Sequence, residues 1–122
     1  MKKLILFFLI GFLYAQYPDT LEIVITPDSG SVADYYTLVV YVKNKQTGQI
    51  DTNFNGAVEI AADNDYLHHI NNYKIVYAYK GVYTTNTFRI YRAGNIYVYG
   101  RCVRGTGRSN LVSLSPLGLS LI

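Results

Sequence analysis

The residues that first suggest chemistry are side-chain oxygens in a short loop. From Asp51 to Gly56, oxygen-bearing side chains occupy alternate positions and a glycine follows, as in the first half of a calcium-binding EF-hand loop. The twelfth position of that loop is a bidentate glutamate, whereas this chain has Ala62 there and no flanking helical pattern. We therefore interpret the segment as a turn before a strand, with Phe54 entering the core and calcium binding as the alternative.

A second oxygen-rich cluster consists of Asp63, Asn64 and Asp65. Three side chains fall short of the ~6–8 oxygens that calcium requires, and the same residue types are common turn formers. We predict a structural turn here, within a long connection over residues 63–72. Calcium is again the alternative.

His68 and His69 raise the question of a zinc site. Adjacent residues of an extended chain point to opposite faces, so the two rings cannot readily bind one ion. The sequence offers no third clear ligand, because Cys102 has the parity expected to face the core. We predict exposed loop histidines, no metal and no cofactor.

Patterns typical of catalysis are not found in the sequence. It contains no Gly-x-Ser-x-Gly elbow, no glycine-rich phosphate loop that opens a helix, and no pair of carboxylates expected in one cleft. We therefore expect no catalytic residues and no enzyme activity.

Tyrosine is the most distinctive residue type, since the chain has 13 tyrosines, one methionine and no tryptophan. Aromatic rings beside arginine are favoured at recognition surfaces, and they also stack on sugar rings. The alternative is cross-strand pairing that only stabilises the sheet, at ~0.2–1 kcal/mol per pair. The candidate binding residues, on or near predicted strands, are Tyr41, Tyr91, Tyr97, Tyr99 and Arg101.

The elements that must position these side chains are strands. Apolar residues recur with period two, as at Leu38 and Val40, and no helical period is sustained after the first 15 residues. Tyr97 and Tyr99 alternate with apolar positions, so both should face outward. The predicted strands span 21–26, 36–42, 57–62, 74–79, 83–91, 96–103 and 110–115, with turns at 27–31 and 105–107. This pattern predicts an all-β protein, a β-sandwich of about seven antiparallel strands.

The first residues are typical of an export signal. Lys2 and Lys3 precede an apolar run over 4–13, which is too short to span a membrane, and Ala15 offers a cleavage point. We predict a signal peptide at 1–15, with an uncleaved anchor as the alternative. Its removal takes away two lysines, so the formal net charge falls from +3 to +1, which gives little reason to expect nucleic-acid binding. One domain over 16–115 then remains, secreted or held at the cell surface or in the periplasm, with no membrane span and no intramolecular disulfide.

Several short motifs recur together in one family of domains: Tyr36 to Lys43, Thr52 to Ile60, Gly81-Val82-Tyr83, Arg92 to Val98, and Ser109 to Leu114. With these motifs the chain resembles bacterial immunoglobulin-like (Ig-like) domains, which occur in adhesins of the invasin and intimin type and in surface-layer proteins. The resemblance covers roughly residues 20–115. It implies an Ig-like sandwich that works in interaction or spacing at the cell surface. The chain departs from the family in holding a single copy, and from antibody-type domains in having Ile96 where their corner tyrosine would stand.

These observations together predict a non-catalytic, exported module that binds a protein or a polysaccharide at the cell envelope. One alternative is a carbohydrate-binding sandwich that uses its outward tyrosines. Another is a small assembly subunit, in which the tail 116–122 serves as a last edge strand or is donated to a neighbouring copy. Leu117, Leu119 and Leu121 alternate in that tail, which makes a homo-oligomer part of this alternative.

Overall fold

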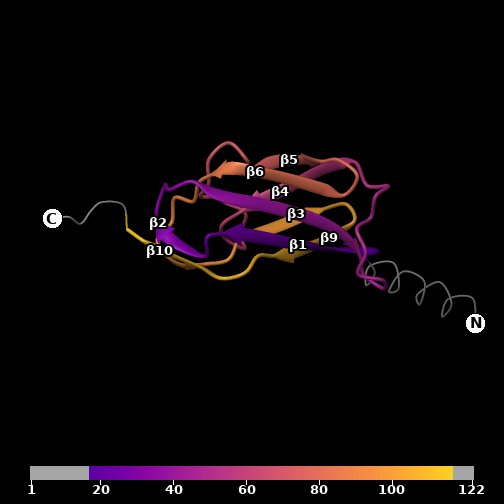
Figure 1. The fold of residues 1–122 in the computed structure, drawn as a ribbon, viewed down its shortest axis with the longest axis horizontal. Helices are drawn as coiled ribbons and strands as arrows, with labels where there is room; N and C mark the ends of the chain where they lie inside the picture. Colours follow the sequence, from indigo (N-terminus) through magenta and orange to yellow (C-terminus); the bar gives the residue numbers. More distant parts are fainter. Residues whose placement is uncertain (1–16, 117–122) are drawn as a thin grey trace, which may run out of the picture.

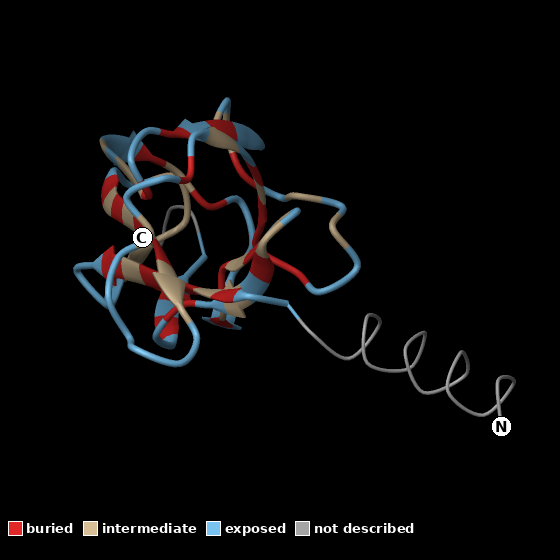
Figure 2. Ribbon diagram, turned by 90° about the vertical axis from the view of Figure 1, so that its right-hand side faces the viewer, coloured by how far each residue is buried: buried red, intermediate tan, exposed pale blue. Residues whose placement is uncertain are grey.

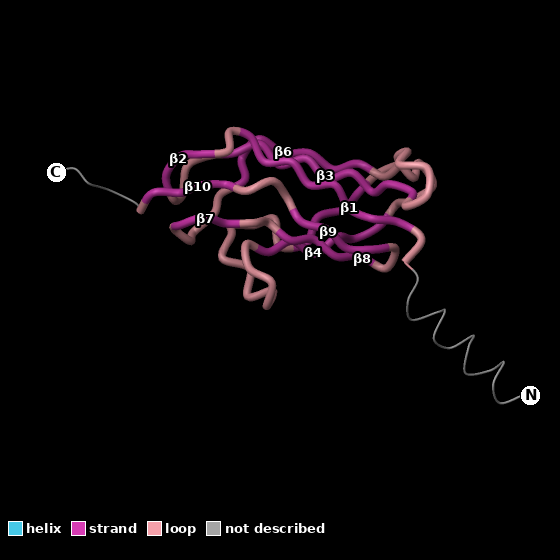
Figure 3. The backbone as a smooth tube through the Cα atoms, turned by 90° about the horizontal axis from the view of Figure 1, so that it is seen from below, coloured by secondary structure: helices cyan, strands magenta, loops and turns pink. Residues whose placement is uncertain are grey.

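The structure, a computed structural model, describes residues 17–116. The signal peptide predicted at 1–15 and the tail beyond Pro116 lie outside the described residues. Within the described range the chain forms strands and loops and no helix (Figure 3), and it has no helix that is long and apolar enough to cross a membrane. The strands are β1 (Asp19–Thr26), β2 (Ser29–Ser31), β3 (Tyr36–Asn44), β4 (Gly56–Ala61), β5 (Ile75–Ala78), β6 (Val82–Phe88), β7 (Gly94–Ile96), β8 (Tyr99–Cys102), β9 (Gly105–Arg108) and β10 (Val112–Ser115).

The strands form three sheets. One sheet has the order β1-β3-β6 and a second has the order β5-β4-β8-β9. These two are stacked as layers, and the small sheet β2-β10-β7 lies at one end of the sandwich (Figures 1 and 3). The predicted all-β fold is confirmed, and the arrangement is that of a β-sandwich.

The core lies between the two large sheets. Alternate residues of β1 and β3 are buried, among them Ile25, Leu38, Val40 and Val42, and the residues between them are half-buried or exposed. The same alternation is seen when the sandwich is viewed end-on (Figure 2). Phe54 is also buried, as predicted. Each fully buried aliphatic or aromatic side chain contributes ~1.5–3 kcal/mol, so a single-domain core needs no cross-link.

The turn predicted at 105–107 is wrong, because these residues belong to strand β9 and the hairpin turns at Val103 and Arg104. The two glycines have a different purpose. A Cβ atom at Gly105 would overlap the backbone of Asp19, and one at Gly107 would overlap the carbonyl of Leu21. Glycine therefore stands in β9 so that this strand can lie close against β1.

Other boundaries also differ from the prediction: the strand expected at 83–91 ends at Phe88, and the one expected at 110–115 begins at Val112. Part of the expected turn at 27–31 forms β2, which pairs with β10 in parallel, so the pairing is not wholly antiparallel and the strand count exceeds seven. The expected strand 96–103 is divided into β7 and β8. Between them, Ser109 accepts the N–H of Val98 through its hydroxyl and donates its own N–H to the carbonyl of Val98, which replaces the regular ladder.

The two long sides of the sandwich are built differently. On one side, which we call the seam, β1 and β9 meet closely and the hydroxyl of Thr20 donates to the carbonyl of Thr106. On the other side, which we call the open side, β5 and β6 are edge strands of different sheets and pair only at Tyr79 and Val82, where the chain turns from one to the other.

Candidate functional site

The outer surface of the sheet β5-β4-β8-β9 brings together several of the predicted binding residues. In this sheet Glu59 of β4 lies between Ile75 of β5 and Arg101 of β8, and Tyr99 of β8 lies opposite Arg108 of β9. Because side chains directly opposite each other in a sheet share one face, all five point away from the core. We call this surface the outer face.

Arg101 is at the centre of the outer face. Its Nε donates to Oε1 of Glu59 at 2.8 Å, and its guanidinium carbon lies 3.9 Å from the ring centroid of Tyr66. Arginine stacked on an aromatic ring is fixed in orientation and remains positively charged. The side chain of Arg101 is about half exposed, so this charge is accessible to a partner.

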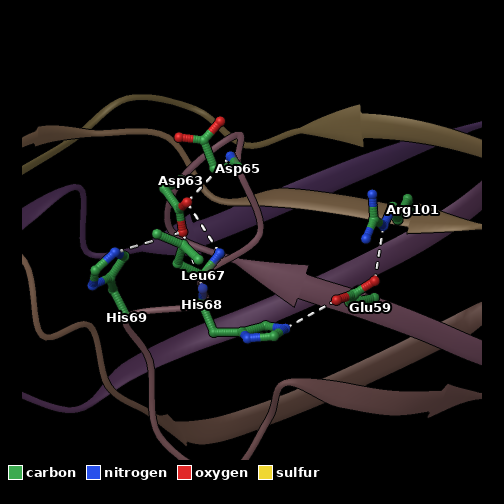
Figure 4. Close-up of polar contacts among 7 residues, drawn as sticks. All are labelled: Glu59, Asp63, Asp65, Leu67, His68, His69 and Arg101. Carbon is green, nitrogen blue, oxygen red and sulfur yellow. Dashed lines mark hydrogen bonds and ion pairs between the residues drawn. The ribbon is translucent and has the colours of Figure 1, made fainter.

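Glu59 binds a second partner, since its Oε2 lies 3.0 Å from Nε2 of His68 (Figure 4). The hydrogen bond from Arg101, together with that from His68, lowers the pKa of Glu59. The carboxylate therefore stays ionised at neutral pH and holds both neighbours in place.

The loop that follows β4 carries Tyr66 and His68 to the outer face. Its backbone is organised by the buried carboxylate of Asp63, which accepts the N–H groups of Asp65, Leu67 and His68 (Figure 4). Tyr66 and His68 have φ angles of 56° and 82°, in the left-handed region. Side-chain acceptors that bind successive amides are what allow such a strained loop to keep one shape.

A second aromatic–arginine cluster lies next to the first. The guanidinium carbon of Arg108 is 4.1 Å from the ring centroid of Tyr97. The rings of Tyr97 and Tyr99 have centroids 6.4 Å apart and meet at 68°, edge to face. Both tyrosines are half-buried and alternate with the buried Ile96, Val98 and Gly100, so their predicted outward orientation is confirmed.

A shallow trough of about 350 Å³ runs beside Arg101. The small side chain of Ala57 on β4 leaves space between Ile75 of β5 on one side and Val103, at the hairpin after β8, on the other. Ile75 and Val103 are 67% and 84% exposed. The outer face thus combines fixed positive charge with exposed apolar surface, a combination typical of recognition sites.

The other two predicted residues lie elsewhere. Tyr41 is on β3, with Nζ of Lys43 5.5 Å from its ring centroid, and belongs to the outer surface of the opposite sheet. Tyr91 lies between β6 and β7, and its N–H donates to the carbonyl of His69. The five candidates therefore do not form one site, although Tyr97, Tyr99 and Arg101 do lie together.

Sequence reasoning missed five members of the outer face: Glu59, Tyr66, His68, Ile75 and Arg108. Glu59 had a usable signal, because it alternates with the buried Val58 and Ile60 on a predicted strand. His68 was considered only as a metal ligand. The position of Tyr66 depends on the loop shape that Asp63 imposes, which no local pattern in the sequence indicates.

The residues considered for metal binding have other partners. In the first loop Asp51 Oδ1 accepts the N–H of Asn53, and Asn55 Oδ1 accepts that of Lys80 at 2.8 Å, as in a structural turn. His68 contacts Glu59, whereas Nε2 of His69 lies 3.9 Å from Asp63. Within residues 17–116 no group of three or more histidine, cysteine, aspartate and glutamate residues is arranged to hold a metal.

A pair of acidic residues is found at the seam. Asp19 is 1% exposed, and Arg104 contacts both Asp19, at 3.2 Å, and Asp51, at 3.4 Å. Burial, together with the neighbouring Asp51, raises the pKa of Asp19, and hydrogen bonding from Asp19 lowers the pKa of Asp51. The cluster joins the start of β1 to the loop before β4 and to the β8–β9 hairpin, and Arg104 covers it.

No protein-family model, curated protein or solved structure matches this chain.

Proposed function

We propose that this chain is an exported, non-catalytic Ig-like module that binds a protein partner at the cell envelope through its outer face. The observation that carries the proposal is the pair of arginine–tyrosine stacks, Arg101 on Tyr66 and Arg108 on Tyr97, beside an exposed apolar trough. Tyrosine and arginine are among the residues most enriched where protein partners bind tightly.

The strand order supports the Ig-like part of the proposal. In constant-type Ig sandwiches the first, second, fourth and fifth strands form one sheet and the third, sixth and seventh form the other, and variable-type domains add strands beside the third. Here β1-β3-β6 faces β5-β4-β8-β9. This fits that order if β5 lies beside the third strand, β4, instead of in the first sheet, and if β7 continues into β8 and β9 into β10. The parallel pairing of β2 with β10 places a short N-terminal strand beside the last one.

The ring geometry favours a protein over a polysaccharide. Stacking on a sugar requires an open ring face, but Arg108 covers one face of Tyr97 and Arg101 lies over Tyr66. Tyr97 and Tyr99 meet at 68°, so they offer no flat platform for successive sugar rings. The exposed guanidinium groups and the trough suit a partner surface that carries carboxylates and a protruding apolar side chain.

The test is photo-crosslinking in the native host. The full chain is tagged and carries a photoreactive phenylalanine in place of Tyr99, and a matched control carries it in place of Tyr41. We expect a discrete adduct with an envelope protein from position 99 and none from position 41, because the two lie on opposite sheets. Adding Arg101→Ala and Arg108→Ala should remove the adduct, whereas Lys43→Ala should not. Equal adducts from both positions, or none, would refute the proposal, as would purified chain that binds a polysaccharide panel through Tyr99.

A further inference from the structure

β5 is an edge strand whose outer backbone groups are unused. Ile60 donates its N–H to the carbonyl of Lys74, and the register then makes Val58 and Val76 the next hydrogen-bonded pair. Ile75 and Tyr77 alternate with these residues, so their N–H and C=O groups point away from β4. Within residues 17–116 no hydrogen bond outside the ladder reaches the backbone of either residue. β5 therefore presents two donors and two acceptors along its free edge.

At two other places in this molecule, edge backbone is closed by an asparagine side chain. The amide of Asn110 accepts the N–H of Ile25 and donates to its carbonyl, along the edge of β1. The amide of Asn71 likewise accepts from the N–H of Arg89 and donates to the carbonyl of Thr87, beside β6. The groove of about 650 Å³ beside β1 is therefore next to backbone that is already paired, whereas the edge of β5 is not.

The side chains on this edge are unusual for exposed positions. Ile75 and Tyr77 are 67% and 68% exposed, and they lie next to each other on the outer face. An exposed apolar edge strand favours association with another strand, which proteins usually prevent. Here the apolar side chains and the unpaired backbone groups coincide, so a partner strand would gain from both.

The charges at the ends of β5 indicate what kind of strand fits. Lys74 and Lys80 flank it, both exposed, and Arg101 lies nearby on the outer face. Pairing with a second copy would gather four lysines along one joined edge, which is the arrangement that edge lysines oppose. A segment with carboxylates at both ends meets opposite charge instead.

From these observations we infer that the free edge of β5 binds an extended polypeptide segment by strand addition, with apolar residues beside Ile75 and Tyr77 and acidic residues beside Lys74 and Lys80. The inference rests on the proposed function, because it names the form in which the partner presents itself. The added strand would extend the sheet to β9-β8-β4-β5-partner and continue the outer face.

The experiment follows amide signals of the isotopically labelled full chain by nuclear magnetic resonance during titration with two synthetic peptides. One is Glu-Val-Thr-Val-Thr-Glu and the other is its lysine-ended counterpart, Lys-Val-Thr-Val-Thr-Lys. We expect the acidic peptide to slow hydrogen exchange at Ile75 and Tyr77, and to bind about tenfold more tightly than the lysine-ended one. Exchanging both charges, with Lys74→Glu and Lys80→Glu, should reverse this preference.

A proline variant isolates the backbone contribution. The N–H of Tyr77 is not used by β4, so Tyr77→Pro removes a donor that only the partner needs, at a place where edge strands tolerate proline. Tyr77→Pro should lose the peptide, whereas the control Tyr77→Thr, which keeps the N–H, should retain it. If the proline variant does not fold, the charge exchange still decides the question.

Three outcomes would overturn the inference. The first is that the acidic peptide does not slow hydrogen exchange at Ile75 and Tyr77, and the second is that charge exchange leaves the peptide preference unchanged. The third is that hydrogen exchange slows with protein concentration alone, which would assign the edge to a second copy. The crosslink from position 99 is independent of these peptides. If that crosslink forms while the edge stays unprotected, the inference fails and the proposed function stands.

Discussion

The seam and the open side of this sandwich differ in how the edge strands of the two large sheets meet. At the seam, β9 lies so close to β1 that Gly105 and Gly107 have no space for a side chain. At the open side, β5 and β6 separate after a single bridge between Tyr79 and Val82. One side excludes any further strand by contact between backbones, and the other leaves an edge available.

The comparison shows how a small sandwich can combine stability with binding. The seam concentrates close packing, the Asn110 contacts and the Asp19–Arg104 ion pair, so it ties the first strand to the last hairpin. The free edge of β5 lacks these restraints, which leaves its backbone available to a partner. Changes at the seam should therefore affect stability far more than changes at the open side.

The largest effect is expected for Gly107→Val. The new Cβ would overlap the carbonyl of Leu21, and because that obstacle is backbone, β1 or β9 must move. We expect a loss of about 3 kcal/mol in the free energy of unfolding, measured by urea denaturation. The matched change on the open side, Thr84→Val on the exposed part of β6, should stay within about 0.5 kcal/mol. Similar losses for the two variants would remove the distinction between the sides.

The asparagine contacts give a finer comparison, with a smaller effect. Asn110→Ala removes both hydrogen bonds to the partly buried backbone of Ile25 and leaves its N–H and C=O unpaired. We expect a loss of about 2 kcal/mol. Asn71→Ala removes two similar bonds, but the one to Thr87 is exposed and water can replace it, so about 1 kcal/mol is expected. Equilibrium denaturation of both variants provides the check, and a larger loss for Asn71→Ala would contradict the ranking.

The sequence predicted the layers better than it predicted the seam. Period-two alternation is a local property, so it placed Leu38 and Val40 in the core and Tyr97 and Tyr99 outside. The close approach of β9 to β1 joins parts of the chain far apart in sequence. Gly105 and Gly107 were therefore predicted as a turn, which is the commoner use of glycine.

The candidate site was predictable to the same extent and for the same reason. Parity on one strand placed Tyr99 and Arg101 on a common outer surface. The contacts of Arg101 with Glu59 and Tyr66 depend on strand order and on a loop held by the Asp63 carboxylate. Spacing along the chain predicts neither the strand order nor the loop shape, so the charged and aromatic side chains that complete the site are identified only from the fold.

The smallest effect concerns the acidic pair at the seam and appears as a dependence on pH. The pKa of Asp19 is raised by burial and by Asp51, so the folded chain binds that proton more tightly than the unfolded chain does. The stability gained from this proton is complete below the pKa of an unfolded aspartate, about 3.9, and is lost as the pH rises through the folded pKa. The asparagine of Asp19→Asn cannot ionise, so this variant does not lose stability as the pH rises through that pKa. Its stability relative to the wild type should therefore increase as the pH rises above about 4.

Asp51→Asn is the matched control with the opposite sign. Because hydrogen bonding from Asp19 lowers the pKa of Asp51, ionised Asp51 contributes stability above the unfolded pKa, and this contribution is lost as the pH falls through the folded pKa. The free energy of unfolding of the Asp51→Asn variant should thus decrease relative to that of the wild type as the pH rises. Urea denaturation at several pH values measures both trends. The opposite outcome would be that Asp19→Asn also loses stability relative to the wild type as the pH rises. Ionised Asp19 would then be a stabilising partner of Arg104, and charge attraction as well as close packing would hold the seam together.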